Sequence, residues 1–143
     1  MSKKDRFPLS LRRFELFAGA RDAELERIGS LLTEVRLPAG SVVLQQDRHD
    51  LQFLVITEGT ARVVRESVDG VDELALVGPG DVVGELALLD RVPRTASVVA
   101  VTPLVAYVAT IGEFSGLLDA SPTVRAHIER IAAARRAANV EAA

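Results

Sequence analysis

The feature that most restricts the fold of this sequence is a series of short β-branched segments between Glu34 and Thr110. Turn residues such as Gly, Pro and Asp separate the segments, as in the runs 38–40, 69–70 and 78–80. Short strands with turn signals at this spacing are typical of an antiparallel sandwich or jelly roll. The candidate strands are 34–37, 41–44, 53–56, 60–65, 73–77, 95–100 and 104–109.

A helical pattern precedes the strand-rich region. Leu25, Ile28 and Leu32 are spaced so that they share one face of a helix, and Asp22 is in the right place to cap its first turn. The sequence therefore predicts a helix from Asp22 to about Leu32.

Two further helices are predicted after the last strand. Thr110 is followed three residues later by Glu113, which has the form of a capping box opening a short helix toward Leu118. Ser121 and Pro122 then supply an N-cap and a proline at the first helical position. The helix after them is expected to run to about residue 138, with Val124, Ile128 and Ile131 on one face and an alanine-rich end.

Composition excludes several classes of chemistry. The 143 residues include no cysteine, which removes disulfides, thiolate metal sites and a cysteine nucleophile. The only histidines, His49 and His127, are far apart in sequence, so a cupin-like metalloenzyme or a Ser-His-Asp hydrolase is disfavoured. We expect no metal site and no catalytic activity.

Charge and hydropathy limit the partners. The formal net charge of −3 has the wrong sign for a module that binds nucleic acid by itself. Residues 1–15 are basic but contain no apolar stretch long enough for a signal peptide or a membrane span. We therefore expect a cytoplasmic protein with no membrane contact and no direct nucleic-acid binding.

The interruption between two strands at residues 84–95 carries the clearest chemical signal. Gly84 opens a segment too short for more than one or two helical turns, and a glycine there lets an anion approach the backbone. The N–H groups from about Leu86 to Leu88 would point at that anion. Arg94 can donate to a phosphate oxygen, and Glu85 can accept from a sugar hydroxyl. These groups together predict a site for a phosphate beside a ribose.

A simpler interpretation of the same residues exists. Glu85 would then only favour the start of a helix, and Arg94 would form a surface ion pair with Glu85 or Asp90. The residues alone do not decide between the two interpretations.

The stretch GELALLDRVPRTASV resembles the phosphate-binding cassette of the cyclic-nucleotide-binding domain family. The resemblance extends from about residue 16 to residue 138 and includes the PAG turn at 38–40 and the Gly80-Asp81 approach to the cassette. It implies a mainly β fold with flanking helices: a jelly-roll β-roll of about eight strands, with a helix before it and two helices after it. It also implies cAMP as the ligand, with cGMP as the second choice.

The resemblance assigns roles residue by residue. Glu85 corresponds to the glutamate that binds the ribose 2′-hydroxyl, and Arg94 to the arginine that binds the exocyclic phosphate oxygens. Thr95 corresponds to the small residue that contacts the cyclic phosphate. Backbone contacts would come from Gly84, Leu86 and Ala87.

The base end of the site is less closely matched. Leu74 and Ala75 correspond to positions that line the purine pocket. The last helix has no aromatic residue to cover the base, so the candidates for a lid are Arg135, Arg136 and Asn139, which could equally be solvated helix surface. The loop after Leu44 carries no glycine where the family often has one, and Asp47 is among the residues there that can still adopt a left-handed conformation.

These features predict a regulatory sensor and not an enzyme. We expect a basic segment at residues 1–15 and a cyclic-nucleotide-binding domain at residues 16–143, whose C-terminal helix moves on ligand binding and signals to an unidentified effector. The alanine-rich helix with Arg135 and Arg136 could also form a homodimer seam. The alternative is an interaction module of the same fold whose pocket is unused or takes a different effector.

Overall fold

The computed structural model describes residues 7–48 and 52–142, with side chains described up to residue 138. It divides into two compact units. One is the strand-rich segment Thr33–Thr110, and the other combines the helices of Met1–Leu32 with those of Ile111–Ala143.

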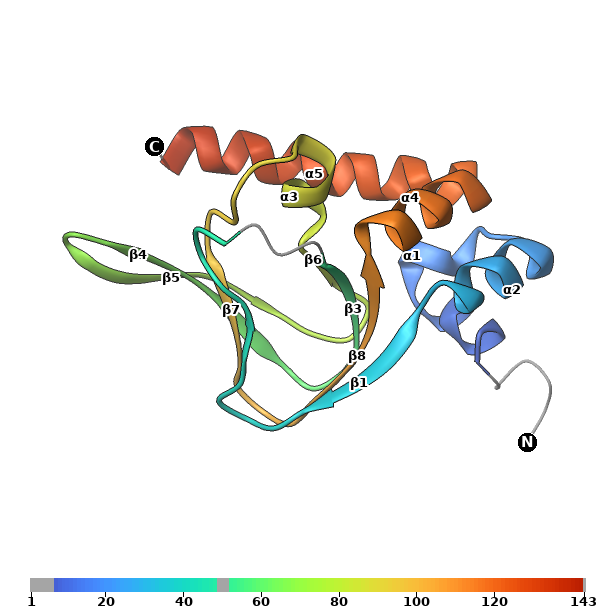
Figure 1. Cartoon of the computed structure of the whole chain (residues 1–143), viewed down its shortest axis with the longest axis horizontal. Helices are drawn as coiled ribbons and strands as arrows, with labels where there is room; N and C mark the ends of the chain where they lie inside the picture. Colours follow the sequence, from blue (N-terminus) through green and yellow to red (C-terminus); the bar gives the residue numbers. More distant parts are fainter. Residues whose placement is uncertain (1–6, 49–51, 143) are drawn as a thin grey trace. The chain divides into compact units, whose positions relative to one another are not determined.

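The strand-rich unit contains two antiparallel four-stranded sheets (Figure 1). The first has the strand order β1-β8-β3-β6, and the second has the order β2-β7-β4-β5. The strands are β1 (Thr33–Leu37), β2 (Val42–Leu44), β3 (Gln52–Glu58), β4 (Ala61–Ser67), β5 (Gly70–Val77), β6 (Val82–Val83), β7 (Ser97–Ala100) and β8 (Leu104–Thr110). A short helix, α3 (Glu85–Asp90), interrupts the strands between β6 and β7.

The predicted jelly-roll fold with flanking helices is confirmed, and the two sheets do not close into a barrel. All seven candidate strands are present, with shifts of a few residues at their ends. The sequence pattern missed β6, whose two residues pair with Leu54 and Val55 of β3. Two residues are too short for any alternation of side chains to show, so only the tertiary pairing defines this strand.

Alternation along the strands builds the core of this unit. In β4 and β5, Ala61 lies opposite Val77, and both side chains are buried, whereas the neighbouring pair Arg62 and Leu76 is exposed. Burial of the alternate aliphatic side chains removes apolar surface from water and holds the sheets together. The core cluster consists of Leu44, Leu54, Ile56, Ala61, Val77, Val83, Val98, Ala100, Leu104 and Ala106.

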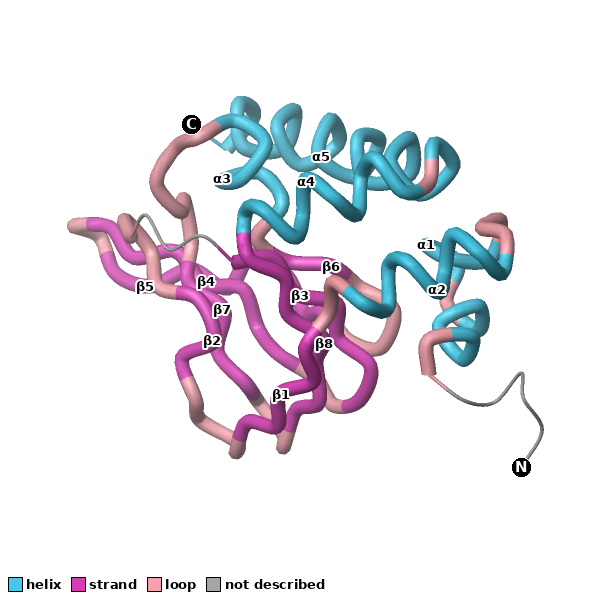
Figure 2. The backbone as a smooth tube through the Cα atoms, turned by 45° about the vertical axis from the view of Figure 1, so that its right-hand side comes forward, coloured by secondary structure: helices cyan, strands magenta, loops and turns pink. Residues whose placement is uncertain are grey.

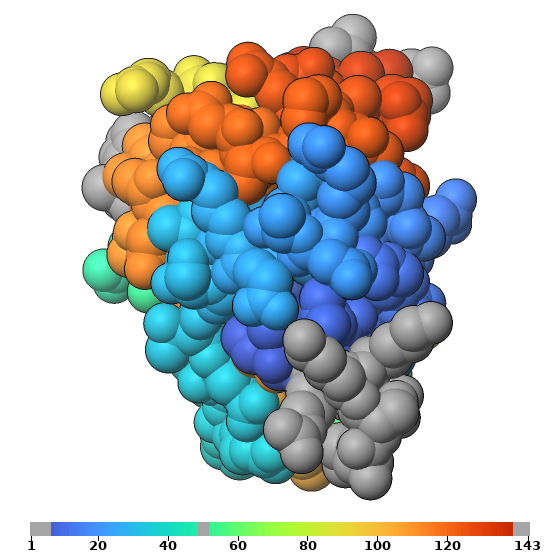
Figure 3. Space-filling view, turned by 90° about the vertical axis from the view of Figure 1, so that its right-hand side faces the viewer, coloured from blue at the N-terminus to red at the C-terminus, as the bar shows by residue number. Residues whose placement is uncertain are grey.

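The helical unit has five helices in the described residues, drawn in cyan in Figure 2 together with α3 of the other unit. They are the 3-10 helix η2 (Leu9–Arg13), α1 (Glu15–Ala18), α2 (Asp22–Ser30), α4 (Ile111–Ala120) and α5 (Pro122–Ala142). The N-terminal helices contact α4 and α5, and Figure 3 shows the blue N-terminal segment packed directly against the orange segment of these two helices. The buried apolar side chains of the unit include Leu11, Phe17, Leu25, Ile28, Phe114, Leu117, Val124, Ile128 and Ala132.

The predicted cap of α2 was wrong by one residue. Arg21, not Asp22, is the N-cap, because its N–H is taken by the Glu24 side chain at 3.0 Å and its carbonyl accepts from Leu25 N. Asp22 is the first helical residue, and its carboxylate pairs with Arg12 at 2.7 Å. The start of the helix is set by the hydrogen bond from the Arg21 N–H to the Glu24 side chain, which comes from the third residue of the helix. A search of the sequence for the best capping residue does not detect such a bond.

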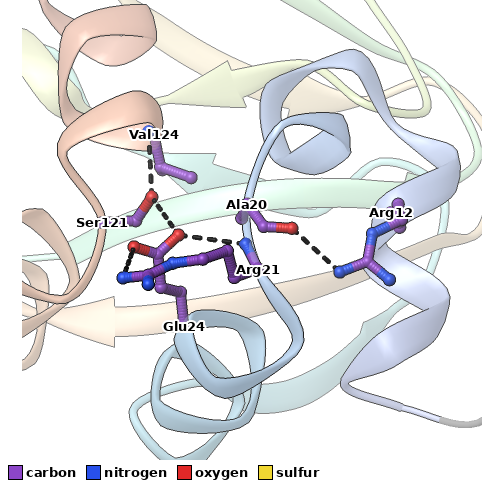
Figure 4. A network of polar contacts seen from close by, with 6 residues as sticks. All are labelled: Arg12, Ala20, Arg21, Glu24, Ser121 and Val124. Atoms are coloured by element: carbon purple, nitrogen blue, oxygen red, sulfur yellow. Dashed lines mark hydrogen bonds and ion pairs between the residues drawn. The ribbon is translucent and has the colours of Figure 1, made fainter.

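The predicted start of α5 is confirmed. Ser121 Oγ accepts a hydrogen bond from Val124 N at 3.3 Å and donates one to Glu24 Oε1 at 3.2 Å, so the cap is also tied to α2 (Figure 4). The backbone N–H of Arg21, followed by the side chains of Arg21 and Ser121, holds the pKa of Glu24 below its usual range. The helix then continues to Ala142, beyond the predicted end.

The boundary expected at residue 15 stays a prediction. The helix η2 and the cap residue Phe14 contribute buried side chains, Leu11 and Phe14, to the helical unit. No helix in residues 7–48 and 52–142 is long and apolar enough to cross a membrane.

Candidate functional site

The first element of the candidate site is the start of α3. The helix begins at Glu85 after Gly84, which has a left-handed backbone with φ of 92°, and no side chain caps it. In a helix the first N–H groups have no carbonyl of the same helix to bond, so those of Glu85, Leu86 and Ala87 form a cluster of donors. Such a cluster suits an anion, and the anion site that the sequence places at about Leu86 to Leu88 stays a prediction.

Arg94 is the second element, and its burial does not fit an interpretation as a surface side chain. Only 5% of the residue is exposed. Its Nη1 donates to the carbonyl of Gly84 at 2.7 Å, and its Nη2 donates to the carbonyl of Gln52. Two backbone carbonyls from separate segments therefore fix the guanidinium next to the residue that opens α3.

Gly84 is required for a reason that the sequence reasoning did not supply. A Cβ on this residue would lie 2.6 Å from Gln52 O and 2.9 Å from Arg94 Nη1, and the positive φ is strained for any L side chain. The space that a side chain would take is occupied by the arginine and its carbonyl partner. Gly84 thus allows the buried guanidinium to reach the start of the helix.

Glu85 and Thr95 differ in exposure. Glu85 is 1% exposed, and no buried side-chain nitrogen or oxygen among the described residues lacks a hydrogen-bond partner, so its carboxylate is held by the protein. Thr95 is exposed and follows the buried Arg94 directly. The structure therefore brings Gly84, Glu85 and Arg94 together and leaves Thr95 accessible beside them.

The backbone of Arg94 is held as firmly as its side chain. Its carbonyl accepts from Asp47 N at 2.8 Å, and its N–H donates to Arg48 O at 3.1 Å. Asp47 has φ of 66°, as expected for an aspartate in place of the family's glycine. The turn after β2 thus supports the arginine, and sequence reasoning missed this role because the two segments are almost fifty residues apart.

The two residues predicted to line the base pocket lie on β5, which is exposed along most of its length. Ala75 lies opposite Val63, on the sheet face that carries the buried pair Ala61 and Val77. Leu74 lies at a shift in the register, and 43% of it is exposed. Ala75 therefore shares a sheet face with Ala61 and Val77 but is itself exposed, and the contact of either residue with a base stays a prediction.

The predicted lid residues lie on α5, in the helical unit. Arg135 is half-buried and Arg136 is exposed. Asn139 lies in the helical backbone, and its side chain is outside the described residues. Their role over a bound base stays a prediction.

Metal-ligating side chains do not form a cluster in the described residues. In the described part of the chain, no three His, Cys, Asp or Glu side chains are grouped so as to hold a metal ion. His127 is half-buried on α5, and His49 lies outside the described residues.

Comparison with known protein families identifies the family of the chain. Residues 34–121 match the model of the cyclic nucleotide-binding domain, and this match covers more than half of the sequence. The chain belongs to the cyclic nucleotide-binding domain family. The matched range contains both sheets except the first residue of β1, and it contains α3 and all the cassette residues, so the family assignment rests on the segment that forms the candidate site.

Individual relatives agree with the family. The chain is 34% identical to acetyltransferase Pat of Mycolicibacterium smegmatis over 124 residues, which are 87% of this chain and 37% of Pat. Among solved structures, the catabolite activator protein of Thermus thermophilus has a TM-score of 0.76 at 29% identity, over 88% of this chain and 59% of that one. A cAMP-binding acyltransferase of Mycobacterium smegmatis has a TM-score of 0.73 at 33% identity, over 90% and 40%. The chain spans well under two thirds of the length of these relatives.

Proposed function

We propose that this chain is a regulatory module that binds cAMP, and cGMP second, without catalytic activity of its own. Membership of the cyclic nucleotide-binding family supports the ligand class, and one of the relatives is described as cAMP-binding. The observation that carries the assignment of the site is the buried Arg94, whose guanidinium is fixed by Gly84 O and Gln52 O beside the open start of α3. Hydrogen bonds from a guanidinium to phosphate oxygens are charge-assisted and strong, so an arginine that is fixed at this position supports the binding of a cyclic phosphate.

The proposal assigns a role to the backbone or the side chain of each of these cassette residues. The N–H groups of Glu85, Leu86 and Ala87 and the Arg94 guanidinium bind the exocyclic phosphate oxygens. Glu85 accepts from the ribose 2′-hydroxyl, and Thr95 adds its hydroxyl and N–H to the phosphate. Each residue acts by hydrogen bonding or charge, so binding requires no covalent step.

Titration calorimetry with cAMP, cGMP and 5′-AMP tests the ligand. We expect heat with cAMP, a smaller affinity for cGMP, and little binding of the open-chain monophosphate. Arg94→Lys keeps the charge but loses the planar fork whose two nitrogens each bond one of the carbonyls Gly84 O and Gln52 O, and we expect it to weaken cAMP binding by about 2 kcal/mol. Folded parent protein that binds neither cyclic nucleotide would support the alternative, a module of the same fold with an unused pocket or another effector.

Signalling is proposed to use the C-terminal helix α5. In this proposal the domain comprises residues 16–143, and ligand binding changes the position or order of α5, which acts on an effector or on a second copy of the chain. A module of this kind would control a separate activity, as the larger relatives combine such a domain with further segments. Hydrogen exchange with and without cAMP tests this step, and unchanged protection in residues 122–140 would contradict it.

A further inference from the structure

Residues 94–96, which contain the proposed phosphate contacts Arg94 and Thr95, leave the sheet immediately before β7. Val64 of β4 lies opposite Ser97, the first residue of β7. The same register continued outward would place Arg65 opposite Ala96 and Glu66 opposite Thr95. Instead, Thr95 and Ala96 bend away from the ladder. Their departure removes the partners that the N–H and C=O of Glu66 would otherwise have on this side, because alternate residues of a strand direct these groups to the same neighbour.

Gln46 provides the missing partners for Glu66. Its side-chain amide donates from Nε2 to Glu66 O at 3.0 Å and accepts from Glu66 N at Oε1 at 2.8 Å. A carboxamide is the same chemical group as a peptide, and this pair of bonds is the exchange that two opposite residues make in an antiparallel ladder. The Gln46 side chain thus replaces one residue of β7 beside β4.

Arg65 provides a hydrogen-bond donor for the carbonyl of Thr95. Its Nε donates to Thr95 O at 3.1 Å, a carbonyl that an intact ladder would direct to β4. The backbone of Gln46 also bonds the start of β7, since its N–H donates to Ser97 Oγ at 2.8 Å. The Gln46 side chain therefore bonds the backbone of β4, and the Arg65 side chain bonds the backbone of the segment 94–96, at the point where this segment leaves the sheet.

We propose that Gln46 is a positioning residue for the cyclic nucleotide, assisted by Arg65. Gln46 would keep β4 paired while the segment 94–96 is displaced toward the ligand, and Arg65 would fix the carbonyl of Thr95 in the displaced position. The proposal rests on the proposed function, because the displaced segment contains Arg94 and Thr95. It assigns a role to a residue outside the cassette, forty-eight positions before Arg94 in the sequence.

The test compares Gln46→Ala with Gln45→Ala, a matched control at the adjacent, exposed glutamine of the same turn. We expect Gln46→Ala to weaken cAMP binding by roughly tenfold, the size of about one net hydrogen bond, while Gln45→Ala binds as the parent does. Gln46→Asn carries the same amide on a side chain one methylene shorter and should not rescue binding. The bonds between Gln46 and Glu66 are exposed, so water can bond the backbone of Glu66 when they are lost, and both Gln46 variants should fold.

A second measurement separates positioning from a general loss of stability. The two phosphorothioate diastereomers of cAMP differ only in which exocyclic oxygen is replaced by sulfur, so the ratio of their affinities reports the placement of the phosphate-binding groups. We expect Gln46→Ala to move this ratio severalfold toward one, and Gln45→Ala to leave it unchanged.

The outcomes are distinguishable. Parent-like affinity and an unchanged diastereomer ratio in Gln46→Ala, with cAMP binding intact in the parent, would overturn the positioning role alone. Weaker cAMP binding with an unchanged ratio would show that Gln46 only stabilises the sheet, which also overturns the proposal. Absence of cyclic-nucleotide binding in the folded parent protein would overturn the proposed function and the role of Gln46 with it.

Discussion

Gly84→Ala should destabilise the protein more than the same change at a glycine of the strand-rich unit that has a positive φ but open space for a Cβ, such as Gly40. Two costs add. The φ of 92° costs an alanine about 1–2 kcal/mol. The new Cβ would also lie 2.6 Å from Gln52 O and 2.9 Å from Arg94 Nη1, and overpacking of this kind costs about 1–3 kcal/mol. The expected loss of unfolding free energy is therefore about 2–5 kcal/mol.

Gly40→Ala is the matched control for the backbone term. Gly40 has a similar φ of 86°, but a Cβ there meets no atom within 4 Å, so only the conformational cost of about 1–2 kcal/mol applies. Gly112→Ala, inside α4 with open space around it, should instead stabilise the protein by up to about 1 kcal/mol. Urea unfolding of the three variants separates conformational strain from the clash.

The same variants test the link between Gly84 and ligand binding. Because the clash displaces the Arg94 guanidinium, Gly84→Ala should also lose cAMP affinity in calorimetry, whereas Gly40→Ala should keep it. If Gly84→Ala costs no more stability than Gly40→Ala and binds cAMP normally, the close packing of Gly84 against Arg94 does not govern the site.

Three further predictions concern the ribose contact and the helical unit. Glu85→Gln should reduce the ratio of the affinities for cAMP and 2′-deoxy-cAMP, measured by competition. An unchanged ratio would show that Glu85 does not bind the ribose hydroxyl. Ser121→Ala removes the cap bond to Val124 N and should lower the unfolding free energy by about 1 kcal/mol in thermal unfolding; no loss would show that water replaces the cap. The lowered pKa of Glu24 stabilises the fold above its ordinary value of 4.5, and this contribution is lost as the pH falls through the lower folded value. Glu24→Gln should therefore be less stable than the parent at pH 7, and urea midpoints should converge in acid; a constant difference would contradict this.

The sequence and the structure agree best where the signal is local. Alternation and turn residues predicted seven strands, and the Ser-Pro pair at residues 121–122 predicted the start of α5. The cap of α2 was misplaced because the deciding bond comes from Glu24, three residues inside the helix. The strand β6 was missed because its pairing with β3 is long-range and its two residues carry no period.

The candidate site was located by sequence but explained only by structure. The glycine, glutamate and arginine of the cassette were identified from their spacing and from the family resemblance. The same residues alone also allowed a surface position for Arg94, and its burial beside the carbonyls of Gly84 and Gln52 does not fit that position. Burial depends on segments that are distant in sequence, so no local pattern could have shown it.

By itself, the sequence determined the strand-rich class and the flanking helices, and it predicted the chemistry of the segment 84–95, because these follow from periodicity, turn residues and side-chain type. Only the tertiary structure decided how Arg94 is held, why Gly84 has no room for a side chain, and that Gln46 completes the ladder of β4. These features arise where the cassette meets β3, β4 and the turn after β2, and hydrogen bonds between such distant segments are set by the folded chain and not by neighbouring residues.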